Sequence, residues 1–369
     1  MHTISQIDNL KDKKVLLRVD FDVPVDINGH ITESFRIEKQ KETINCLIDR
    51  EAKVFMVAHS NYIPSFQPII KQLKVLLNHH VKFIPELKAA TQIELDENLG
   101  LLENIRIHEG EKKNDENLGR LLSTGFDYYI NNAFAESHRN YVSVSAVTKF
   151  IPSYAGLLIE KETSQLQKAI DAPKGGKIII IGGAKAETKV PVIKNLIDKS
   201  DKVIVGGIVA NDILKERGRD IGDSVADENS KELLAGLNLN DSHLVVPEDF
   251  NIFENKIFDI GPKSIARYEE FIKSAKMIIW NGPMGLFEDF RFSAGTDAIG
   301  RAVANARGNK VIGGGDTVAA VSRLGILDKF DPSVNSGQSF VSTGGGAMLE
   351  FLAGNKLPGL EALGYYESR

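Results

Sequence analysis

The sequence predicts an α/β protein of two lobes, each a doubly wound, Rossmann-like parallel sheet with helices on both faces, joined by a hinge helix. Short apolar runs alternate with longer segments of helical spacing along the chain, as is typical of parallel sheets covered by helices. The chain has 369 residues, more than one hydrophobic core usually serves, so two domains are expected. The residues that follow the apolar runs differ in kind between the two halves, which indicates lobes with different tasks.

Eight apolar runs are predicted to be strands. They span residues 15–19, 54–57, 128–130, 178–181, 203–205, 244–246, 277–280 and 311–312. In open parallel sheets, ligands bind in the crevice beyond the carboxyl ends of the strands. The residues that directly follow these runs are therefore the candidates for binding and chemistry.

The lobes are expected to meet at a helix that begins near Gly156. Residues 158–170 place Ile159, Leu166 and Ile170 on one face of a helix. The dipeptide Ala-Pro that follows is a signal for the end of the helix. A single helix between two lobes is either a hinge or a plain spacer.

Composition narrows the class of protein. The net charge is −5, which argues against binding to nucleic acids or membrane surfaces, since both need a basic footprint. Any acidic substrate therefore needs a local cluster of basic side chains. Cys46 is the single cysteine, so no intrachain disulfide forms, and it is interpreted as a buried structural thiol. The polar N-terminus and the lack of a long apolar stretch predict a cytoplasmic protein.

Charged and polar side chains follow the runs of the first half, whereas glycines follow those of the second half. The first set is Arg18, Asp20, His59, Arg106, His108, Asn131, Asn132, His138 and Arg139. The second set consists of glycine turns at 182–185, 206–207, 281–285, 313–316 and 343–346. Glycine turns before helices expose N–H groups that suit phosphate oxygens, although glycine also serves tight connections. Five such turns favour a nucleotide or another polyphosphate, without a P-loop or G-x-G-x-x-G motif.

Two lysines and two acids lie close to these turns. Lys185 and Lys189 would share a helical face and hold a transferring phosphoryl group, or they are simply solvated. Asp316 would either cap a helix or hold Mg²⁺ beside phosphate oxygens. Glu288 would accept ribose hydroxyl groups, or it is an ordinary exposed acid.

Four arginines of the first half are candidates for a shared anion site. Arg18, Arg36, Arg106 and Arg139 would give paired donors to a carboxylate or phosphate, joined by two histidines, His59 and His138. The alternative is four unrelated surface charges. The histidines lack the spacing of metal ligands, so core or hydrogen-bonding roles are favoured over zinc.

Six motifs occur in series along the chain. They are Arg18-Val-Asp-Phe-Asp-Val-Pro24, Glu103-Asn-Ile-Arg-Ile-His108, Gly182-Gly-Ala-Lys185, Trp280-Asn-Gly-Pro-Met-Gly-Leu-Phe-Glu288, Gly313-Gly-Gly-Asp-Thr317 and Ser342-Thr-Gly-Gly-Gly-Ala347. In this order they resemble the phosphoglycerate kinase family. The similarity covers nearly the whole chain and includes Leu357-Pro-Gly-Leu360.

The resemblance implies a monomeric, cytoplasmic phosphotransferase of glycolysis with a carboxyl group as acceptor. With Mg²⁺ it would exchange a phosphoryl group between 1,3-bisphosphoglycerate and ADP, giving 3-phosphoglycerate and ATP. The acid-binding lobe would comprise residues 1–156 and about 353–369, and the nucleotide-binding lobe residues 173–352. Residues 157–172 would form the interdomain helix, about which the lobes close like a hinge.

The resemblance also assigns site residues by motif. The acid would be bound by Arg18, Asp20, Phe21, Asp22, Arg36, His59, Arg106, His138 and Arg139. The nucleotide would be bound by Gly183, Lys185, Lys189, Gly206, Gly207, Asn281, Pro283, Glu288, Gly314, Gly315, Asp316 and Thr317. Catalysis would depend on Arg36, Lys185 and Lys189, and Asp316 would hold the metal.

The chain departs from the family pattern mainly at the acid site. The substitutions there are Tyr62 for an arginine, Asp22 for Asn, Asn132 for Asp and Tyr141 for His. Elsewhere Ile257-Phe258 replaces a Gly-Leu pair, and a polar surface loop at 331–339 is longer than usual. Two alternatives therefore stay open: a relative that binds nucleotide but has an eroded acid site, and a kinase of a different acid.

Overall fold

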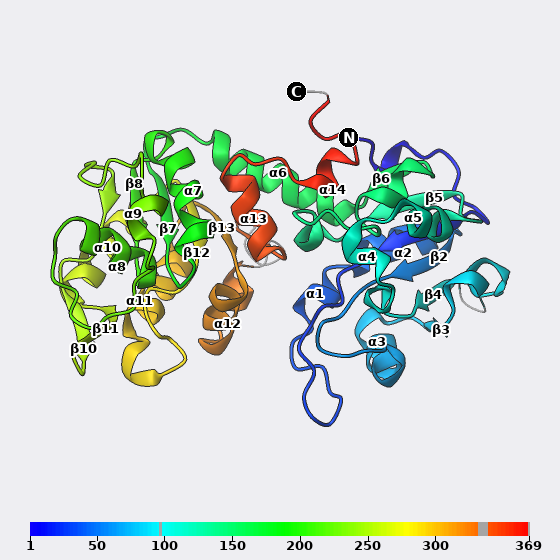
Figure 1. The fold of residues 1–369 in the computed structure, drawn as a ribbon, viewed down its shortest axis with the longest axis horizontal. Coiled ribbons are helices and arrows are strands. Elements are labelled where there is room, and N and C mark those ends of the chain that lie inside the picture. The colour runs from blue at the N-terminus through cyan, green and yellow to red at the C-terminus, as the bar shows by residue number, and fades with distance from the viewer. Residues whose placement is uncertain (96–97, 331–338, 368–369) are drawn as a thin grey trace. The chain divides into compact units, whose positions relative to one another are not determined.

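The computed structural model describes residues 1–95, 98–330 and 339–367. The chain divides into two compact units (Figure 1). Met1–Thr163 and Lys356–Arg369 form the first, called here the N unit, and Ser164–Asn355 form the second, the C unit. The division falls within helix α6 (Leu157–Asp171), which covers the segment predicted as the joining helix.

The N unit is built on a parallel sheet in the order β3-β4-β2-β1-β5-β6. Its strands are β1 (Lys14–Arg18), β2 (Lys53–Val57), β3 (Lys82–Ile84), β4 (Leu99–Leu102), β5 (Tyr128–Asn131) and β6 (Ser153–Ala155). Every neighbouring pair in this sheet is parallel. The first three predicted runs form β1, β2 and β5, whereas β3, β4 and β6 are additional short strands.

The C unit has a second parallel sheet, in the order β14-β13-β12-β7-β8-β9. Its strands are β7 (Lys177–Ile181), β8 (Lys202–Val205), β9 (Leu244–Val245), β12 (Met277–Asn281), β13 (Asn309–Gly313) and β14 (Ser339–Ser342). An antiparallel hairpin of β10 (Phe250–Phe253) and β11 (Lys256–Ile260) forms a separate two-stranded sheet. The other five predicted runs all form strands of the parallel sheet.

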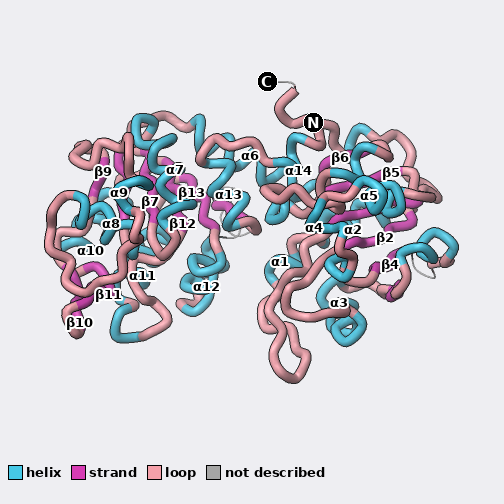
Figure 2. Tube along the Cα trace, viewed as in Figure 1, coloured by secondary structure: helices cyan, strands magenta, loops and turns pink. Residues whose placement is uncertain are grey.

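Helices fill most of the connections between the strands of each sheet (Figure 2). In the N unit they are α1 (Phe35–Glu38), α2 (Lys41–Asp49), α3 (Ile70–Leu77), α4 (Gly110–Lys113), α5 (Glu116–Ser123) and α14 (Pro358–Glu361). In the C unit they are α7 (Ala186–Leu196), α8 (Gly207–Glu216), α9 (Ser230–Leu233), α10 (Pro262–Lys273), α11 (Ala294–Asn305), α12 (Gly315–Arg323) and α13 (Gly345–Leu352). The predicted α/β fold class is confirmed.

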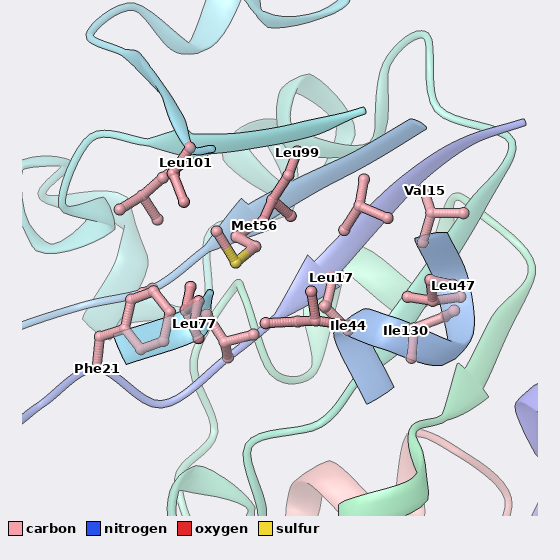
Figure 3. Packing of buried hydrophobic residues seen from close by; sticks show 14 of the residues in the cluster. Val15, Leu17, Phe21, Ile44, Leu47, Met56, Leu77, Leu99, Leu101 and Ile130 are labelled. Carbon is pink, nitrogen blue, oxygen red and sulfur yellow. The ribbon is translucent and has the colours of Figure 1, made fainter. Parts of the chain in front are cut away.

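Both faces of the N-unit sheet are buried. Consecutive residues of a strand point to opposite faces, so Leu17 belongs to one core cluster and Leu16 to the other. The first cluster contains side chains of α2 and α3, and Figure 3 shows Ile44 of α2 beside Leu17. The second cluster contains Leu122 of α5. Helices therefore cover this sheet on both sides, which leaves the carboxyl ends of its strands as the accessible edge.

The last residues of the chain return to the N unit. Gly359 of α14 donates its N–H to the carbonyl of Ser137 at 2.8 Å. The amino group of Met1 donates to the carbonyl of Gly364 at 3.0 Å. The N unit is therefore assembled from two separate stretches of sequence.

Three further predictions concern single segments. The polar loop predicted at 331–339 lies outside the described residues, except for Ser339, which begins β14. Across residues 1–95, 98–330 and 339–367, no helix has both the length and the apolar character needed to cross a membrane. Cys46 on α2 is half-buried rather than fully buried, and burial raises the pKa of its thiol.

Candidate functional site

Charged residues gather beyond the carboxyl ends of three adjacent strands in the N unit. Because β1 lies between β2 and β5, the ends of these strands share one edge of the sheet. Asp20 follows β1, His59 follows β2 and Glu136 follows β5. We use the name anion site for the group Asp20, Asp22, Arg36, His59, Arg106, Glu136 and Arg139.

Arg18 is fully buried and its guanidinium group binds inside the N unit. Its Nε donates to Ser143 Oγ at 2.9 Å, and its Nη1 donates to the carbonyl of Val19. Its Nη2 lies 2.8 Å from Nδ1 of His59. An arginine can only donate, so Nδ1 of His59 accepts and the imidazole carries its proton on Nε2. Arg18 thus orients His59 within the site.

Glu136 lies among the cations of the anion site, although the sequence had not marked it. Its side chain is only 4% exposed. Its Oε2 lies 3.4 Å from Arg139 Nη1, 3.6 Å from His59 Nε2 and 3.7 Å from Arg106 Nη2. This carboxylate therefore lies between Arg139 of its own segment, His59 after β2 and Arg106 of a 3₁₀ helix.

Asn61 joins Asp22 to Arg106. Its backbone N–H and its Nδ2 each donate to a different carboxylate oxygen of Asp22, both at 2.7 Å. Its Oδ1 accepts from Arg106 Nη1 at 2.6 Å. Burial alone would raise the pKa of Asp22, but the nearby imidazole of His59, whose Nε2 lies 3.5 Å from Asp22 Oδ2, and the hydrogen bonds from Asn61 together outweigh it and hold that pKa well below its usual range. Asp22 is therefore a fixed negative charge.

Asp20 and Arg36 form a second pair in the site. Arg36 Nη1 lies 3.5 Å from Asp20 Oδ2 and donates to the carbonyl of Asp22 at 3.3 Å. Burial raises the pKa of Asp20, and the charge of Glu136 acts in the same direction, against the guanidinium group of Arg36. For Arg36, burial alone would lower the pKa, but the charges of Asp20, Glu33, Asp22 and Glu136 together outweigh it, so the pKa is raised.

Two tyrosines mark the departures from the family pattern. The centroid of the Tyr141 ring is 5.1 Å from the guanidinium carbon of Arg106 and 5.7 Å from that of Arg139. The ring thus stacks against both arginines by cation–π interactions. Tyr62, where the resemblance expects an arginine, is 55% exposed.

Two other predicted acid-binding residues differ in their environment. Phe21 is fully buried and packs edge-to-face against Phe66, with ring centroids 6.3 Å apart, so its side chain belongs to the hydrophobic core. His138 lies beside Arg139, whose Nε is 3.4 Å from His138 Nε2. The structure thus gathers Asp20, Asp22, Arg36, His59, Arg106 and Arg139 and leaves the side chain of Phe21 in the core.

Five polar atoms of the anion site are buried without a hydrogen-bond partner among the described residues. They are Asp20 Oδ2, His59 Nε2, Arg106 Nε, Arg106 Nη2 and Glu136 Oε2. Buried polar atoms in proteins are nearly always hydrogen-bonded. Their concentration in one place indicates a ligand with anionic oxygens for the N–H groups and a hydroxyl group for a carboxylate.

The C unit contains a separate cavity of about 260 Å³. Five of the predicted nucleotide-binding residues line it: Gly183, Gly207, Pro283, Glu288 and Asp316. The wall also includes apolar side chains, among them Ile257, Phe258, Met284 and Leu286. An apolar wall with a few polar groups at the rim is typical of a site for an organic ligand with an aromatic ring.

The glycines near this cavity have two distinct tasks. Gly207 has a φ of +59°, and a Cβ there would lie 2.6 Å from the backbone nitrogen of Gly183. A Cβ on Gly206 would lie 2.9 Å from the Cα of Met284. These glycines allow the turns to pack on one another. Gly315 differs, because a Cβ there would meet no atom within 4 Å, so its backbone faces open space.

Asn281 and Thr317 connect neighbouring turns of the C unit. Asn281 Nδ2 donates to the carbonyl of Gly313 at 2.9 Å, and a Cβ on Gly314 would lie 2.9 Å from that nitrogen. The N–H of Gly282 donates to Thr317 Oγ1 at 2.7 Å. Both side chains are buried. They fix the positions of the turns that the sequence predicts to bind a nucleotide.

Lys185 and Lys189 lie at the start of α7, as the sequence predicts. Lys185 occupies the position before the helix with a φ of +65°. Lys189 is 7% exposed, and its Nζ donates to the carbonyl of Ala184 at 2.5 Å. Burial lowers the pKa of Lys189 to about 8; the charge of Lys185 adds to this effect and that of Asp316 opposes it.

Asp316 lies in the first turn of α12 and is exposed at the cavity. Gly314, not Asp316, occupies the N-cap position, so the carboxylate is not the cap of this helix. In the described part of the chain, three or more His, Cys, Asp or Glu residues nowhere gather as a metal site. A lone carboxylate fits Mg²⁺, since this ion is commonly held by one or two carboxylates together with phosphate oxygens and water.

Sequence reasoning missed three residues of these sites. Glu136 stands two positions before His138, so the acid in that segment was a usable signal. Asn61 binds Arg106, which is 45 positions away, and nothing local announces this contact. Asp259 lines the C-unit cavity and accepts N–H groups of Ile260 and Gly295, while burial raises its pKa to about 6.

Comparisons with known proteins agree with one another. A family model described as Phosphoglycerate kinase matches residues 4–355. A phosphoglycerate kinase of Coprothermobacter proteolyticus is 35% identical over 96% of both chains, and one of Prochlorococcus marinus is 38% identical over 98% of both. The crystal structure of phosphoglycerate kinase from Pyrococcus horikoshii has a TM-score of 0.85 at 30% identity and covers 100% of both chains. The structure from Coxiella burnetii has a TM-score of 0.83 at 31% identity over 98% of both chains. The chain therefore belongs to the phosphoglycerate kinase family.

Proposed function

We propose that this chain catalyses the reversible, Mg²⁺-dependent transfer of a phosphoryl group between 1,3-bisphosphoglycerate and ADP, which gives 3-phosphoglycerate and ATP in glycolysis. The observation that carries the proposal is the set of five buried polar atoms in the anion site that form no hydrogen bond with a described residue. Membership of the family supports the identity of the reaction. The separate cavity of the C unit supports a second ligand of different chemistry.

The acid is proposed to bind in the anion site. Arg106 and Arg139 suit the anionic oxygens of the ligand, because guanidinium groups give paired, charge-assisted hydrogen bonds. His59 donates through Nε2, which Arg18 leaves protonated. Asp20 would accept a hydroxyl group of the acid through Oδ2, which has no hydrogen bond within the described residues. Arg36 neutralises charge at the carboxyl end of the acid, where the phosphoryl group is exchanged.

The nucleotide is proposed to bind in the C unit, with its base in the cavity and its ribose hydroxyl groups at Glu288. Backbone N–H groups at the start of α12, near Gly315, suit phosphate oxygens. Lys185 and Lys189 would hold the transferring group. The other residues assigned to the nucleotide, including Gly206, Asn281, Gly314 and Thr317, would act by shaping these turns.

The metal is proposed to lie beside Asp316, with phosphate oxygens and water as its remaining ligands. When bound, Mg²⁺ would neutralise charge on the phosphate oxygens. Phosphoryl transfer needs alignment and charge neutralisation more than a covalent nucleophile. In this proposal Arg36, Lys185 and Lys189 supply the neutralisation from the protein.

The two ligands must meet for transfer to occur. We propose that the units close like a hinge when both ligands are bound, which also excludes water from the reacting groups. We further propose that the enzyme acts as a monomer in the cytoplasm. A single cysteine among 369 residues fits a reducing compartment.

A coupled assay with 3-phosphoglycerate and MgATP tests the proposed function. Turnover that requires both substrates and stops on addition of EDTA would support it. A folded protein that binds MgATP but shows neither turnover nor binding of 3-phosphoglycerate would instead match a family member with an eroded acid site. A panel of other phosphorylated acids, assayed in parallel, would reveal a kinase of a different acid.

A further inference from the structure

Glu136 places a negative charge where an acidic ligand needs positive ones. Its Oε2 lies 3.4 Å from Arg139 and 3.7 Å from Arg106, and no described residue gives it a hydrogen bond. The same oxygen is 3.6 Å from Nε2 of His59, the atom that carries the imidazole proton. The carboxylate of Glu136 therefore occupies the surroundings that an oxygen of a bound acid would have.

The charges that face one another in the anion site cancel. Three are cations, Arg36, Arg106 and Arg139, and three are anions, Asp20, Asp22 and Glu136. His59 is neutral, because its Nδ1 accepts from Arg18. Behind it, Arg18 contacts Ser143, and Ser143 donates to Glu111 at 2.6 Å, so this buried cation also has a buried anion nearby. The net charge of the site is thus 3 − 3 = 0.

A phosphorylated acid brings roughly three negative charges, one from its carboxylate and up to about two from its phosphate. A neutral, largely buried site gives such a ligand no net compensation, and burying uncompensated charge is costly. Protonation of one carboxylate in the site lowers this cost, because it removes a negative charge and leaves a guanidinium group available to the ligand.

We propose that Glu136 is an internal counter-anion of the site, and that the acid binds together with a proton that the Asp20–Glu136 carboxylates take up. The inference rests on the proposed function for the identity of the acid. In the free protein Glu136 balances Arg106 and Arg139. On binding, oxygens of the ligand take over these two arginines, and the proton removes the competing charge.

The surroundings of Glu136 identify Asp20 as the second carboxylate. The groups that face Glu136 are Arg36 of α1, His59 after β2, Arg106 of the 3₁₀ helix η4 (Ile105–Ile107), Arg139, and Asp20 after β1. Asp20 is the one like charge among them, it is 1% exposed, and its Oδ2 accepts no hydrogen bond from a described residue. Burial and the charge of Glu136 both raise the pKa of Asp20. A bound anion would raise it further.

Isothermal titration calorimetry of the full chain with 3-phosphoglycerate tests the inference. The titration is repeated at pH 7.5 in two buffers of different ionisation enthalpy, so that the difference in measured heat gives the number of protons taken up. At this pH the phosphate of the free ligand is almost fully ionised, since its second pKa is about 6. Protons taken up must therefore bind to the protein.

The wild-type protein is expected to take up a large fraction of one proton, and its affinity is expected to fall as pH rises from 7 to 9. The Glu136→Gln variant is expected to take up far fewer protons and to bind at least about tenfold more tightly, because a like charge next to the ligand is gone. The matched control is Glu116→Gln. It removes one charge from an exposed ion pair with Lys149 in the same unit and should behave as the wild type.

Binding without proton uptake by the wild-type protein would overturn the inference and leave the proposed function standing. Weaker binding by a folded Glu136→Gln variant, checked by thermal unfolding, would also overturn it. If neither protein binds the acid, the proposed function and the inference fail together.

Discussion

Nη2 of Arg18 lies 2.8 Å from Nδ1 of His59, and this contact decides which nitrogen of the imidazole carries the proton. Arg18 itself is fully buried, so its charge serves the site through His59. A charged residue at the carboxyl end of an apolar strand thus acts as a positioning residue.

Replacement of Arg18 by Met should weaken both the fold and the binding of the acid. The variant leaves Ser143 and His59 without their donor, so we expect a loss of about 3 kcal/mol in the free energy of unfolding. Chemical denaturation measures this loss, and calorimetry should show weaker 3-phosphoglycerate binding with unchanged MgADP binding. Arg120→Met, which removes an exposed arginine stacked on Phe150, is the control and should cost less than about 1 kcal/mol.

Replacement of Arg106 by Ala should reduce the affinity for 3-phosphoglycerate about ten- to a hundredfold, because a charge-assisted pair of hydrogen bonds is lost. The affinity for MgADP, which binds in the other unit, should stay within about twofold. Titration of each ligand separately measures both quantities. An equal loss for the two ligands would contradict the assignment of acid and nucleotide to different units.

Replacement of Asp316 by Asn should have the opposite selectivity. We expect a loss of about tenfold in the affinity for MgADP, through the metal, and no change for 3-phosphoglycerate. In EDTA the variant and the wild type should bind ADP alike. The control Asp328→Asn removes an exposed acid of the same unit. It should leave the affinities for MgADP, for 3-phosphoglycerate and for ADP in EDTA unchanged.

The plot of kcat/KM against pH should fall on its basic side near pH 8 because of Lys189. Its pKa is about 8 in the free protein, below the ordinary value of 10.5, so the charged amine is lost as pH rises through 8. If the charge is needed for transfer, kcat/KM should fall above this pH, because that ratio reports the free enzyme. In Lys189→Arg this fall should move to higher pH, since arginine stays protonated.

The lowered pKa of Lys189 also predicts how the free energy of unfolding changes with pH. Between pH 8 and 10.5 the unfolded chain binds more protons at Lys189 than the folded one, so the contribution of this group to the free energy of unfolding rises with pH. Comparison of the wild type with Lys189→Met by denaturation at pH 7.5 and 9.5 measures it. A larger advantage of the wild type at pH 7.5 than at pH 9.5 would contradict the lowered pKa.

Replacement of Gly207 by Ala should destabilise the C unit by about 2–4 kcal/mol. The residue has a φ of +59°, and the new Cβ would lie 2.6 Å from a backbone nitrogen that cannot easily move. Gly175→Ala is a matched control, because its Cβ would meet no atom within 4 Å. Thermal unfolding should separate the two variants clearly, and similar melting temperatures would show that the turns can relax.

The sequence predicted most strands that consist of strongly apolar runs, except β4 (Leu-Gly-Leu-Leu), and missed several less apolar ones. β7 reads Lys-Ile-Ile-Ile-Ile and is buried throughout, so its run stands out. β3 is Lys-Phe-Ile and β6 is Ser-Tyr-Ala, and three residues are too few to show the alternation that marks a strand. Pairing with a neighbouring strand makes them strands, and this pairing cannot be predicted from the three residues alone.

The sequence predicted those site residues that come soon after the carboxyl end of a strand. That rule led to Asp20, His59 and Arg139, which the structure brings together. It also placed Arg18 at the acid, whereas the structure buries this arginine behind His59. Asn61 and Glu136 were not predicted, because the partners that give them a place in the site are distant in sequence: Arg106 for Asn61, and His59 and Arg106 for Glu136.

The discontinuous N unit has a consequence for the order in which the chain can fold during synthesis. Residues 164–355, which form the C unit, leave the ribosome as one stretch, while the N unit still lacks its piece from residue 356 onward. The contact between Gly359 and Ser137 therefore forms after every residue of the C unit has been made. The half of the protein that is translated first is the half that is completed last.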